Sequence, residues 1–342
     1  MNPTGRRTGL TPSSVLASVT VGLEEFIERQ GGRSREVLAR AGLQPQLYLQ
    51  PNRHIALRNY CSSMYEAARA TGNEHFGLGF GEQFAPEGLG LYGYCAITAP
   101  DLRTSIGCME RFFPVFQGNS LLKFSRANGL CTLEYQLLDG DIPDRRQDAE
   151  LTLGMINNVL RRGMGQHWVP EAVHFQHPAL VQIGPHRDAF RCDVRFGQHH
   201  NAIVLRESCL GQPMPDADAM LHNVALGTLE ALRGQAQQQL SLTQRTRNAV
   251  IERLPRGEAG LDGVARALAL SKRSLQRQLA DEGTSFAALL DDVRETLAEY
   301  HLLYDRLNVS EVAWRLGYSE VSAFSRAFVR WKHMSPTEWA QP

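Results

Sequence analysis

The chain has 342 residues, of which 43% are hydrophobic and 21% charged, and its 36 basic and 36 acidic side chains give a formal net charge of zero. This length favours two domains, and the even balance of charge excludes a general binder of polyanions. The sequence has no secretory signal, no apolar run near the roughly 18 residues of a membrane span, and no C-x-x-C pair, which predicts a cytoplasmic protein with reduced thiols and no membrane contact.

The opening of the chain is predicted to be helical after a loose tail over residues 1–12. Apolar residues then recur three or four positions apart, as they do on one face of a helix. This spacing predicts three amphipathic helices, over 13–31, 34–43 and 56–72. Glycine readily adopts the left-handed conformation that ends a helix, and Gly42 and Gly72 stand at the ends of the second and third.

A stretch rich in glycine and aromatic residues follows, over 74–98. Its glycines predict tight strand connections or close packing. The segment G-L-G-F-G-E lacks the strand–turn–helix context and the full G-x-G-x-x-G spacing of a phosphate site, so no nucleotide cofactor is expected. Aromatic residues over 76–116 favour either a site for an apolar or amphipathic ligand or, more commonly, a core; they are Tyr92, Tyr94, Phe112, Phe113 and Phe116.

The region from residue 101 to residue 215 mixes helices with strands. Helices are predicted over 101–117, with Asp101 as its cap, and over 146–165. A β-hairpin turning at Asn128 and Gly129 is expected between them. Alternation predicts further strands over 171–177, 192–198 and 201–207. We therefore expect an α+β domain over residues 1–215, followed by a helical linker over 216–241 with a glutamine-rich end.

Several residues in this region are candidates for chemistry. His174 and His177 form an H-x-x-H pair, but alternation along a strand would place them on opposite faces, which disfavours a metal site. The six cysteines favour buried neutral thiols over a redox sensor. No nucleophile motif is present, so we expect no metal, no cofactor and no enzyme activity.

One pattern occurs twice after residue 242, first over 264–279 and again over 312–328. Each copy reads as helix, tight turn and helix, with a small alanine where the helices cross and Ser271 or Ser319 as the cap of the second helix. This is the plan of a helix-turn-helix motif, whose second helix enters the major groove of DNA. A helix predicted over 286–305 would span roughly 30 Å, close to the roughly 34 Å of one DNA turn.

These residues resemble the DNA-binding domain of the AraC/XylS family of bacterial transcription regulators. The resemblance is carried by A-L-S-K-R-S-L-Q-R-Q-L-A-D-E-G-T-S-F (269–286), by Arg294 with Ala298, and by V-A-W-R-L-G-Y-S-E-V-S-A-F-S-R-A-F-V-R-W-K-H-M-S-P (312–336). His333 and Ala340 depart from the family pattern, which has a glycine and a basic residue there. The preceding half resembles the family's arabinose-binding-type sensor in looser motifs, at 76–82, 89–98, 173–178, 193–197 and 210–216.

The second helix of each motif supplies the candidate DNA-binding residues. In the first copy they are Lys272, Arg273, Gln276 and Arg277; in the second they are Ser322, Ser325, Arg326 and Arg330, with Val321 also facing outward. The resemblance places Arg273, Gln276 and Arg277 at positions that read bases. Arginine can hold guanine and glutamine can hold adenine by two hydrogen bonds, whereas serine discriminates poorly. We expect the first motif to supply most of the sequence discrimination.

The sequence thus predicts an α+β sensor and dimerisation domain followed by an all-α domain over 242–342 with two helix-turn-helix motifs. The expected function is regulation of transcription through promoter double-stranded DNA, with a homodimer, a small-molecule effector and RNA polymerase as further partners. One alternative keeps the DNA binding but makes the N-terminal half a ligand-independent dimerisation or protein-contact module. An enzyme fused to a DNA-binding domain ranks last, because no cluster of titratable residues stands out.

Overall fold

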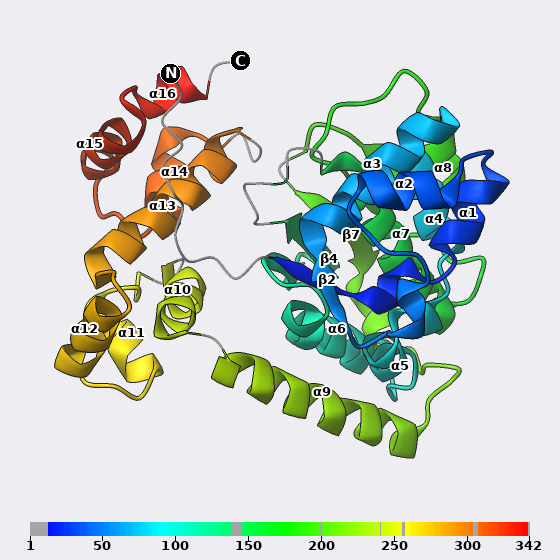
Figure 1. Ribbon diagram of the computed structural model, residues 1–342, viewed down its shortest axis with the longest axis horizontal. Coiled ribbons are helices and arrows are strands. Elements are labelled where there is room, and N and C mark those ends of the chain that lie inside the picture. Colours follow the sequence, from blue (N-terminus) through cyan, green and yellow to red (C-terminus); the bar gives the residue numbers. More distant parts are fainter. Residues whose placement is uncertain are drawn as a thin grey trace. The chain divides into compact units, whose positions relative to one another are not determined.

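The computed structural model divides the chain into two compact units, one ending at Arg233 and the other beginning at Gly234 (Figure 1). The described residues are 13–137, 142, 145–198, 200–239, 241–254, 257–303 and 307–340. The predicted tail over 1–12 lies outside them.

The N-terminal unit opens with a small sheet rather than with the long helix predicted over 13–31. β1 (Ser14–Leu16) pairs antiparallel with β2 (His54–Ala56), and a 3-10 turn (Ala17–Thr20) leads into α1 (Leu23–Arg29). The helical prediction was wrong for its first half because β2 supplies a strand partner for residues 14–16 and Gly22, at φ +75°, interrupts the chain. The apolar residues Leu16 and Val19 are nevertheless buried.

The next two helices follow the prediction. They are α2 (Ser34–Arg40) and α3 (Leu57–Thr71), with a short 3-10 turn (Leu47–Leu49) between them. Gly42 and Gly72 take left-handed conformations at their ends, with φ +71° and +66°. A helix end of this kind needs a residue without a Cβ penalty, so glycine is the natural choice.

The glycine-rich stretch is helical, so the predicted strand connections are wrong and the predicted close packing is right. It forms α4 (Phe76–Gln83), a 3-10 turn (Pro86–Leu89) and α5 (Leu91–Ile97). A Cβ on Gly77 would lie 2.3 Å from the carbonyl oxygen of Gln147, and one on Gly81 would lie 2.5 Å from that of Leu151. Both carbonyls belong to α7 (Arg146–Met164), so the glycines let the two helix backbones touch.

A five-stranded sheet completes this unit. Its order is β3-β4-β7-β5-β6, with β5 and β6 parallel and the other neighbours antiparallel. The strands are β3 (Ser120–Ala127), β4 (Leu130–Leu137), β5 (Ala172–His174), β6 (Asp193–Arg195) and β7 (Asn201–Arg206). Asn128 and Gly129 turn the β3–β4 hairpin with φ values of +54° and +75°, as predicted.

Helices α6 (Leu102–Phe116) and α7 pack on this sheet, and α8 (Gly184–Phe190) follows β5. The Asp101 carboxylate caps α6 by accepting from the Thr104 backbone amide at 2.8 Å. After β7, a 3-10 turn (Glu207–Gly211) leads to the long helix α9 (Ala219–Gln239), shown in lime green in Figure 1. Ala225 and Leu229 of α9 are buried in the core of the N-terminal unit, so the first half of the predicted linker packs on that unit.

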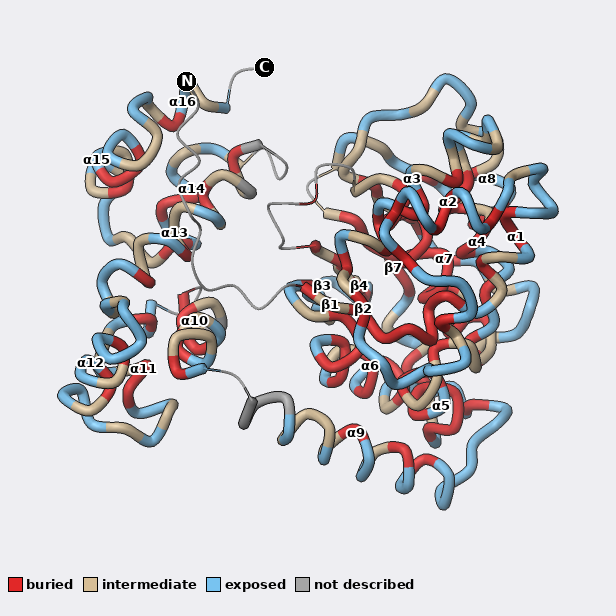
Figure 2. Tube along the Cα trace, in the orientation of Figure 1, coloured by how far each residue is buried: buried red, intermediate tan, exposed pale blue. Residues whose placement is uncertain are grey.

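The C-terminal unit is helical throughout its described residues. Its helices are α10 (Leu242–Arg253), α11 (Leu261–Ala267), α12 (Lys272–Asp281), α13 (Phe286–Leu303), α14 (Val309–Arg315), α15 (Val321–Lys332) and α16 (Pro336–Trp339). Figure 2 marks buried residues along their inner faces. They form two hydrophobic clusters, and α13 contributes to both, with Leu289 and Val293 in one and Ala298 and Leu302 in the other. The predicted fold class, α+β followed by helical helix-turn-helix motifs, is confirmed.

Candidate nucleic-acid interface

Two helix-turn-helix motifs form where the repeat predicts them, α11 with α12 and α14 with α15. The valine and alanine that begin each pattern are buried; they are Val264, Ala265, Val312 and Ala313. Each turn closes with the same backbone hydrogen bond, from Leu270 to Ala265 at 2.9 Å and from Tyr318 to Ala313 at 3.0 Å. The repeated sequence pattern therefore folds into a repeated backbone geometry.

The two turns differ at one residue that both need in a left-handed conformation. Gly317 occupies it in the second motif with φ +69°, whereas the first motif has Ala269 there with φ +55°. A side chain in this region is strained, because Cβ approaches the following carbonyl oxygen. The first motif thus carries backbone strain that the second avoids.

The caps of the two second helices also differ. Ser271 accepts a hydrogen bond from the Ser274 backbone amide at 3.1 Å and caps α12 as predicted. The prediction for Ser319 was wrong: α15 starts one residue later in its repeat, its N-cap is Glu320, and no side-chain hydrogen bond caps it. The one-residue slip between the two copies moves the serine out of the capping position.

Helix α12, the second helix of the first motif, exposes all four of its predicted DNA-binding residues to solvent. Leu275 and Leu279 are fully buried, and Lys272, Arg273, Gln276 and Arg277 are exposed. Lys272 Nζ lies 3.1 Å from Asp262 Oδ1. Within the described part of the chain, Arg273, Gln276 and Arg277 form no hydrogen bond or ion pair, so their donors are available to a ligand.

More of the corresponding residues of α15 have hydrogen-bond or ion-pair partners within the protein. Ser325 donates to the Val321 carbonyl oxygen at 3.0 Å, and Ser322 donates to Glu320 Oε2 at 3.2 Å. Arg330 Nη2 lies 2.7 Å from Asp291 Oδ2 on α13. Val321 is half-buried against the second hydrophobic cluster, so its predicted outward orientation was wrong.

Arg326 is the exception on α15. It is exposed, and among the described residues it has no hydrogen-bond or ion-pair partner. In each motif the predicted residues therefore lie on one helix. Among the described residues, fewer of those on α15 than of those on α12 are free of partners within the protein. Sequence reasoning missed the acidic partners Asp262 and Asp291, because neither lies on the same helix as its cation.

Helix α13 fixes the second motif through Arg294. The Arg294 Nε donates to the Leu316 carbonyl oxygen at 3.0 Å, and its guanidinium carbon lies 4.2 Å from the centre of the Tyr318 ring. Both contacts hold the turn of the second motif. Guanidinium stacking on an aromatic ring and a charge-assisted hydrogen bond reinforce each other in a partly buried place.

Lys332, at the end of α15, makes a second connection to α13. It lies 2.9 Å from Glu295 Oε1 and also pairs with Glu299. Burial alone would lower the pKa of Lys332, but the two carboxylates outweigh burial and hold that pKa above its usual range. The 18 residues of α13 span about 27 Å, which sets the spacing of the two motifs.

Comparisons with known proteins identify the two halves of the chain. Residues 31–214 match the family described as the arabinose-binding domain of AraC transcription regulators, N-terminal, and residues 264–341 match a helix-turn-helix domain. The chain belongs to the AraC family of transcription regulators. It is accordingly a DNA-binding regulator with an arabinose-binding-type N-terminal domain.

Some relatives of this AraC-family regulator match it over nearly their whole length. The transcriptional regulator VirS of Mycobacterium tuberculosis is 26% identical over 334 residues, which is 96% of each chain. The ornithine utilization regulator of Pseudomonas aeruginosa is 25% identical over 323 residues, or 91% of each. The crystal structure of CdpR from Pseudomonas aeruginosa matches 93% of this chain and 98% of its own at 22% identity, with a TM-score of 0.43.

Across the described residues, no helix combines the length and the apolar character needed to cross a bilayer.

Proposed function

We propose that this regulator recognises promoter DNA by placing α12 and α15 in consecutive major grooves, with α12 supplying most of the sequence discrimination. The observation that carries this proposal is the difference in availability between the two helices. Arg273, Gln276 and Arg277 are exposed and unengaged among the described residues, and their side chains suit guanine and adenine. On α15 the serines and Arg330 already have partners within the protein.

In this proposal α15 serves mainly to anchor the protein on the phosphate backbone. Arg326 is the available cation, and Arg330 contributes by exchanging Asp291 for a phosphate. Contacts to phosphates fix the register of a protein on DNA but carry no direct sequence information. The neutral overall charge limits nonspecific affinity, so the binding depends on these local contacts.

Gel-shift titration of the full-length protein on sites found by genome-wide footprinting tests DNA recognition. We expect the triple substitution of Arg273, Gln276 and Arg277 by alanine to abolish preference for these sites over scrambled DNA. Arg187→Ala, at an exposed position of α8 in the N-terminal unit, is the matched control and should bind like the wild type. Retained site preference in the triple variant would contradict the proposal.

We further propose that the chain works in three parts: a sensor and dimerisation domain over 1–215, a helical linker over 216–241 and a DNA-binding domain over 242–342. The linker proposal rests on α9, which is partly buried on the N-terminal unit through Ala225 and Leu229. Its other face exposes Met220, Leu221 and Val224. A second copy of this chain would cover these apolar side chains, which supports a homodimer.

An effector would act from the N-terminal domain, where an internal cavity of about 20 Å³ lies among apolar side chains. The cavity has Tyr60, Tyr92 and Phe113 in its wall and holds no more than about one water molecule. An effector that enters it must therefore open the core, which would shift the protein between two states. Tyr92, Phe112, Phe113 and Phe116 are buried, and Tyr94 is exposed, so most of the predicted aromatic group belongs to the core.

A ligand-independent N-terminal module is the second candidate, and the small size of the cavity favours it. Native mass spectrometry of the full-length protein distinguishes the two: a co-purifying small molecule supports sensing. Site affinity and footprint that stay unchanged across all candidate metabolites support the alternative. In either case we propose that the protein is not an enzyme and that it acts in the cytoplasm, with RNA polymerase as its partner at promoters.

A further inference from the structure

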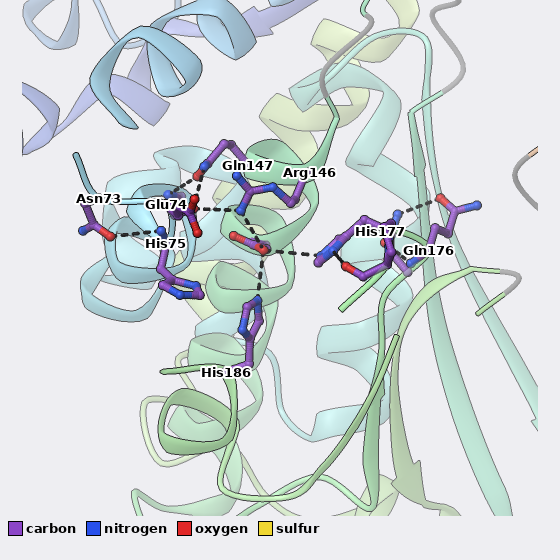
Figure 3. Close-up of polar contacts among 12 residues, drawn as sticks. Asn73, Glu74, His75, Arg146, Gln147, Gln176, His177 and His186 are labelled. Atoms are coloured by element: carbon purple, nitrogen blue, oxygen red, sulfur yellow. Dashed lines mark hydrogen bonds and ion pairs between the residues drawn. The ribbon is translucent and has the colours of Figure 1, made fainter. Parts of the chain in front are cut away.

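A cluster of buried ligand-type side chains lies in the N-terminal unit, away from the DNA-binding residues. Glu150 projects from α7, His177 follows β5, and His186 belongs to α8. Their ligand atoms all lie within 4.8 Å of one another. Figure 3 shows the rings of His177 and His186 converging from different elements on one point, with Arg146 on a further side.

Both imidazole rings approach the same oxygen atom of the Glu150 carboxylate. His186 Nε2 lies 2.9 Å from Glu150 Oε1, and His177 Nε2 lies 3.4 Å from the same atom. Ligand atoms around a tetrahedral zinc ion stand about 3.3–3.5 Å apart, as follows from bonds of about 2.0–2.2 Å. The two distances from Glu150 Oε1, 2.9 and 3.4 Å, are close to this, so small side-chain rotations would bring the three ligand atoms to the spacing that a metal ion needs.

A purely hydrogen-bonded arrangement leaves this cluster incompletely satisfied. The side chains of Glu150 and His186 are fully buried. Within the described part of the chain, Glu150 Oε2, His177 Nε2 and His186 Nδ1 are buried atoms without a hydrogen-bond partner. A buried polar atom left unpaired costs about 1–3 kcal/mol, and an ion bound between the two rings would give His177 Nε2 its missing partner.

The aromatic side chains around the cluster suit a metal, and Arg146 Nη1, which lies 3.5 Å from Glu150 Oε1, would have to withdraw when the ion binds. His177 Nδ1 lies 3.0 Å from the Pro178 carbonyl oxygen, which fixes the proton on Nδ1 and leaves Nε2 as the electron-pair donor. Phe175 packs against His186, and Phe196 packs against both histidine rings, at ring distances of 5.0–5.8 Å among these residues.

We propose that Glu150, His177 and His186 form a binding site for a divalent transition-metal ion of the Zn²⁺ class. Two histidines and one carboxylate leave open coordination positions for water or a small anionic ligand. The ion would fasten the segment from 177 to 190 onto α7, directly beside Leu151 and Thr152 in the wall of the internal cavity. The site belongs to the N-terminal unit and does not depend on DNA recognition.

Titration of Zn²⁺ into untagged, chelator-treated full-length protein tests the site. We expect one high-affinity ion, with His177→Ala and His186→Ala each weakening the affinity at least tenfold. His174→Ala is the matched control, because His174 lies on the neighbouring strand β5 but outside the cluster, and it should bind within about twofold of the wild type. His177, whose side chain is 11% exposed, is the variant least expected to disturb folding.

A second readout separates this site from a cluster of Cys95, Cys108 and His222, whose ligand atoms also lie within 4.8 Å of one another. Co²⁺ bound to Glu150 and the two histidines should give ligand-field absorption without sulfur-to-cobalt charge transfer. Zn²⁺ at about 100 times its Kd should raise the Tm of the N-terminal unit by about 5 °C or more in the wild type but not in His177→Ala. No tight binding, equal binding by His177→Ala, or charge-transfer bands lost in Cys108→Ser would each overturn the proposal.

Discussion

The two helix-turn-helix motifs have the same backbone plan but differ in how their exposed side chains are used. In the first motif, α12 has a serine cap and leaves two arginines and a glutamine unengaged among the described residues. In the second motif, α15 has no side-chain cap, its serines bond to Glu320 and Val321 at its own start, and Arg330 pairs with Asp291 of α13. The second motif compensates with attachments to α13 through Arg294 and Lys332. This difference is the basis of our proposal that the first copy discriminates between sequences and the second anchors the protein on DNA.

The largest expected effect comes from removing the core of one motif while the other stays intact. Phe328 is fully buried and packs near Trp331 and Trp339, with ring centres 6.3 Å and 6.0 Å away. We expect Phe328→Ala to cost about 3–5 kcal/mol of stability. The matched change Leu279→Ala in the first motif should cost about 2–5 kcal/mol.

Once Trp168 is replaced by phenylalanine, the remaining tryptophans lie at 314, 331 and 339, all in the second motif or directly after it. Tryptophan fluorescence during denaturation of that variant therefore follows the unfolding of the second motif. Footprinting then gives the functional consequence. Phe328→Ala should lose protection over one groove and keep it over the other. Equal loss of protection over both grooves would mean that the two motifs do not bind independently, which would contradict the division of roles between them.

The next largest effect concerns sequence discrimination. We expect Arg277→Ala to lower affinity for the true site by about 1–3 kcal/mol and to relax preference at its base pair, because a bidentate contact to guanine would be lost. Arg326→Ala should weaken binding to true and scrambled DNA alike and reduce the salt dependence of binding. Competition gel shifts with both DNAs provide the measurement; the division of labour fails if Arg326→Ala relaxes specificity more than Arg277→Ala does.

A smaller effect follows from the turns. Ala269 is exposed and left-handed, so Ala269→Gly should stabilise the first motif by about 1 kcal/mol. The reciprocal Gly317→Ala should destabilise the second by about 1 kcal/mol, since a Cβ there would lie 3.4 Å from the Leu254 carbonyl oxygen without a severe clash. Thermal unfolding of both variants shows whether each change stabilises or destabilises its motif. A lower Tm for Ala269→Gly would contradict backbone strain at Ala269.

The smallest effect concerns the two ion pairs at exposed positions. Asp291→Asn releases Arg330, and Asp262→Asn releases Lys272. Such pairs contribute about 0–1 kcal/mol, so stability should hardly change. Affinity for any DNA should rise by about two- to fivefold at low salt, because an acidic group near the phosphates is removed. A changed base preference in either variant would show that the acidic residue takes part in reading.

Much of the C-terminal unit could be predicted from the sequence because its signals are local. The spacing of valine, alanine and leucine fixes the buried face of each helix, and Ser271 caps the helix that it immediately precedes. The failures have one local and one longer-range cause. Ser319 and Val321 were misplaced because a one-residue slip changes the start of α15, and the ion pair of Arg330 depends on α13, which lies earlier in the chain.

The N-terminal unit was predictable in its hairpin and long helices but not where tertiary packing overrides composition. Gly77 and Gly81 predicted strand connections or close packing; they lie in the helix α4, and only the close packing, against α7, was right. The start of the chain reads as a helix until β2, about forty residues further on, supplies a strand partner. Glu150 and His186 carry no motif, and only the fold brings them to His177.

The most direct test of the central claim is hydroxyl-radical footprinting of the wild-type protein on a site found by genome-wide mapping. Two helices held in consecutive major grooves by α13 should protect two segments on one face of the duplex, with centres about 10 base pairs apart. Protection of a single segment, or of two segments on opposite faces, would contradict the account.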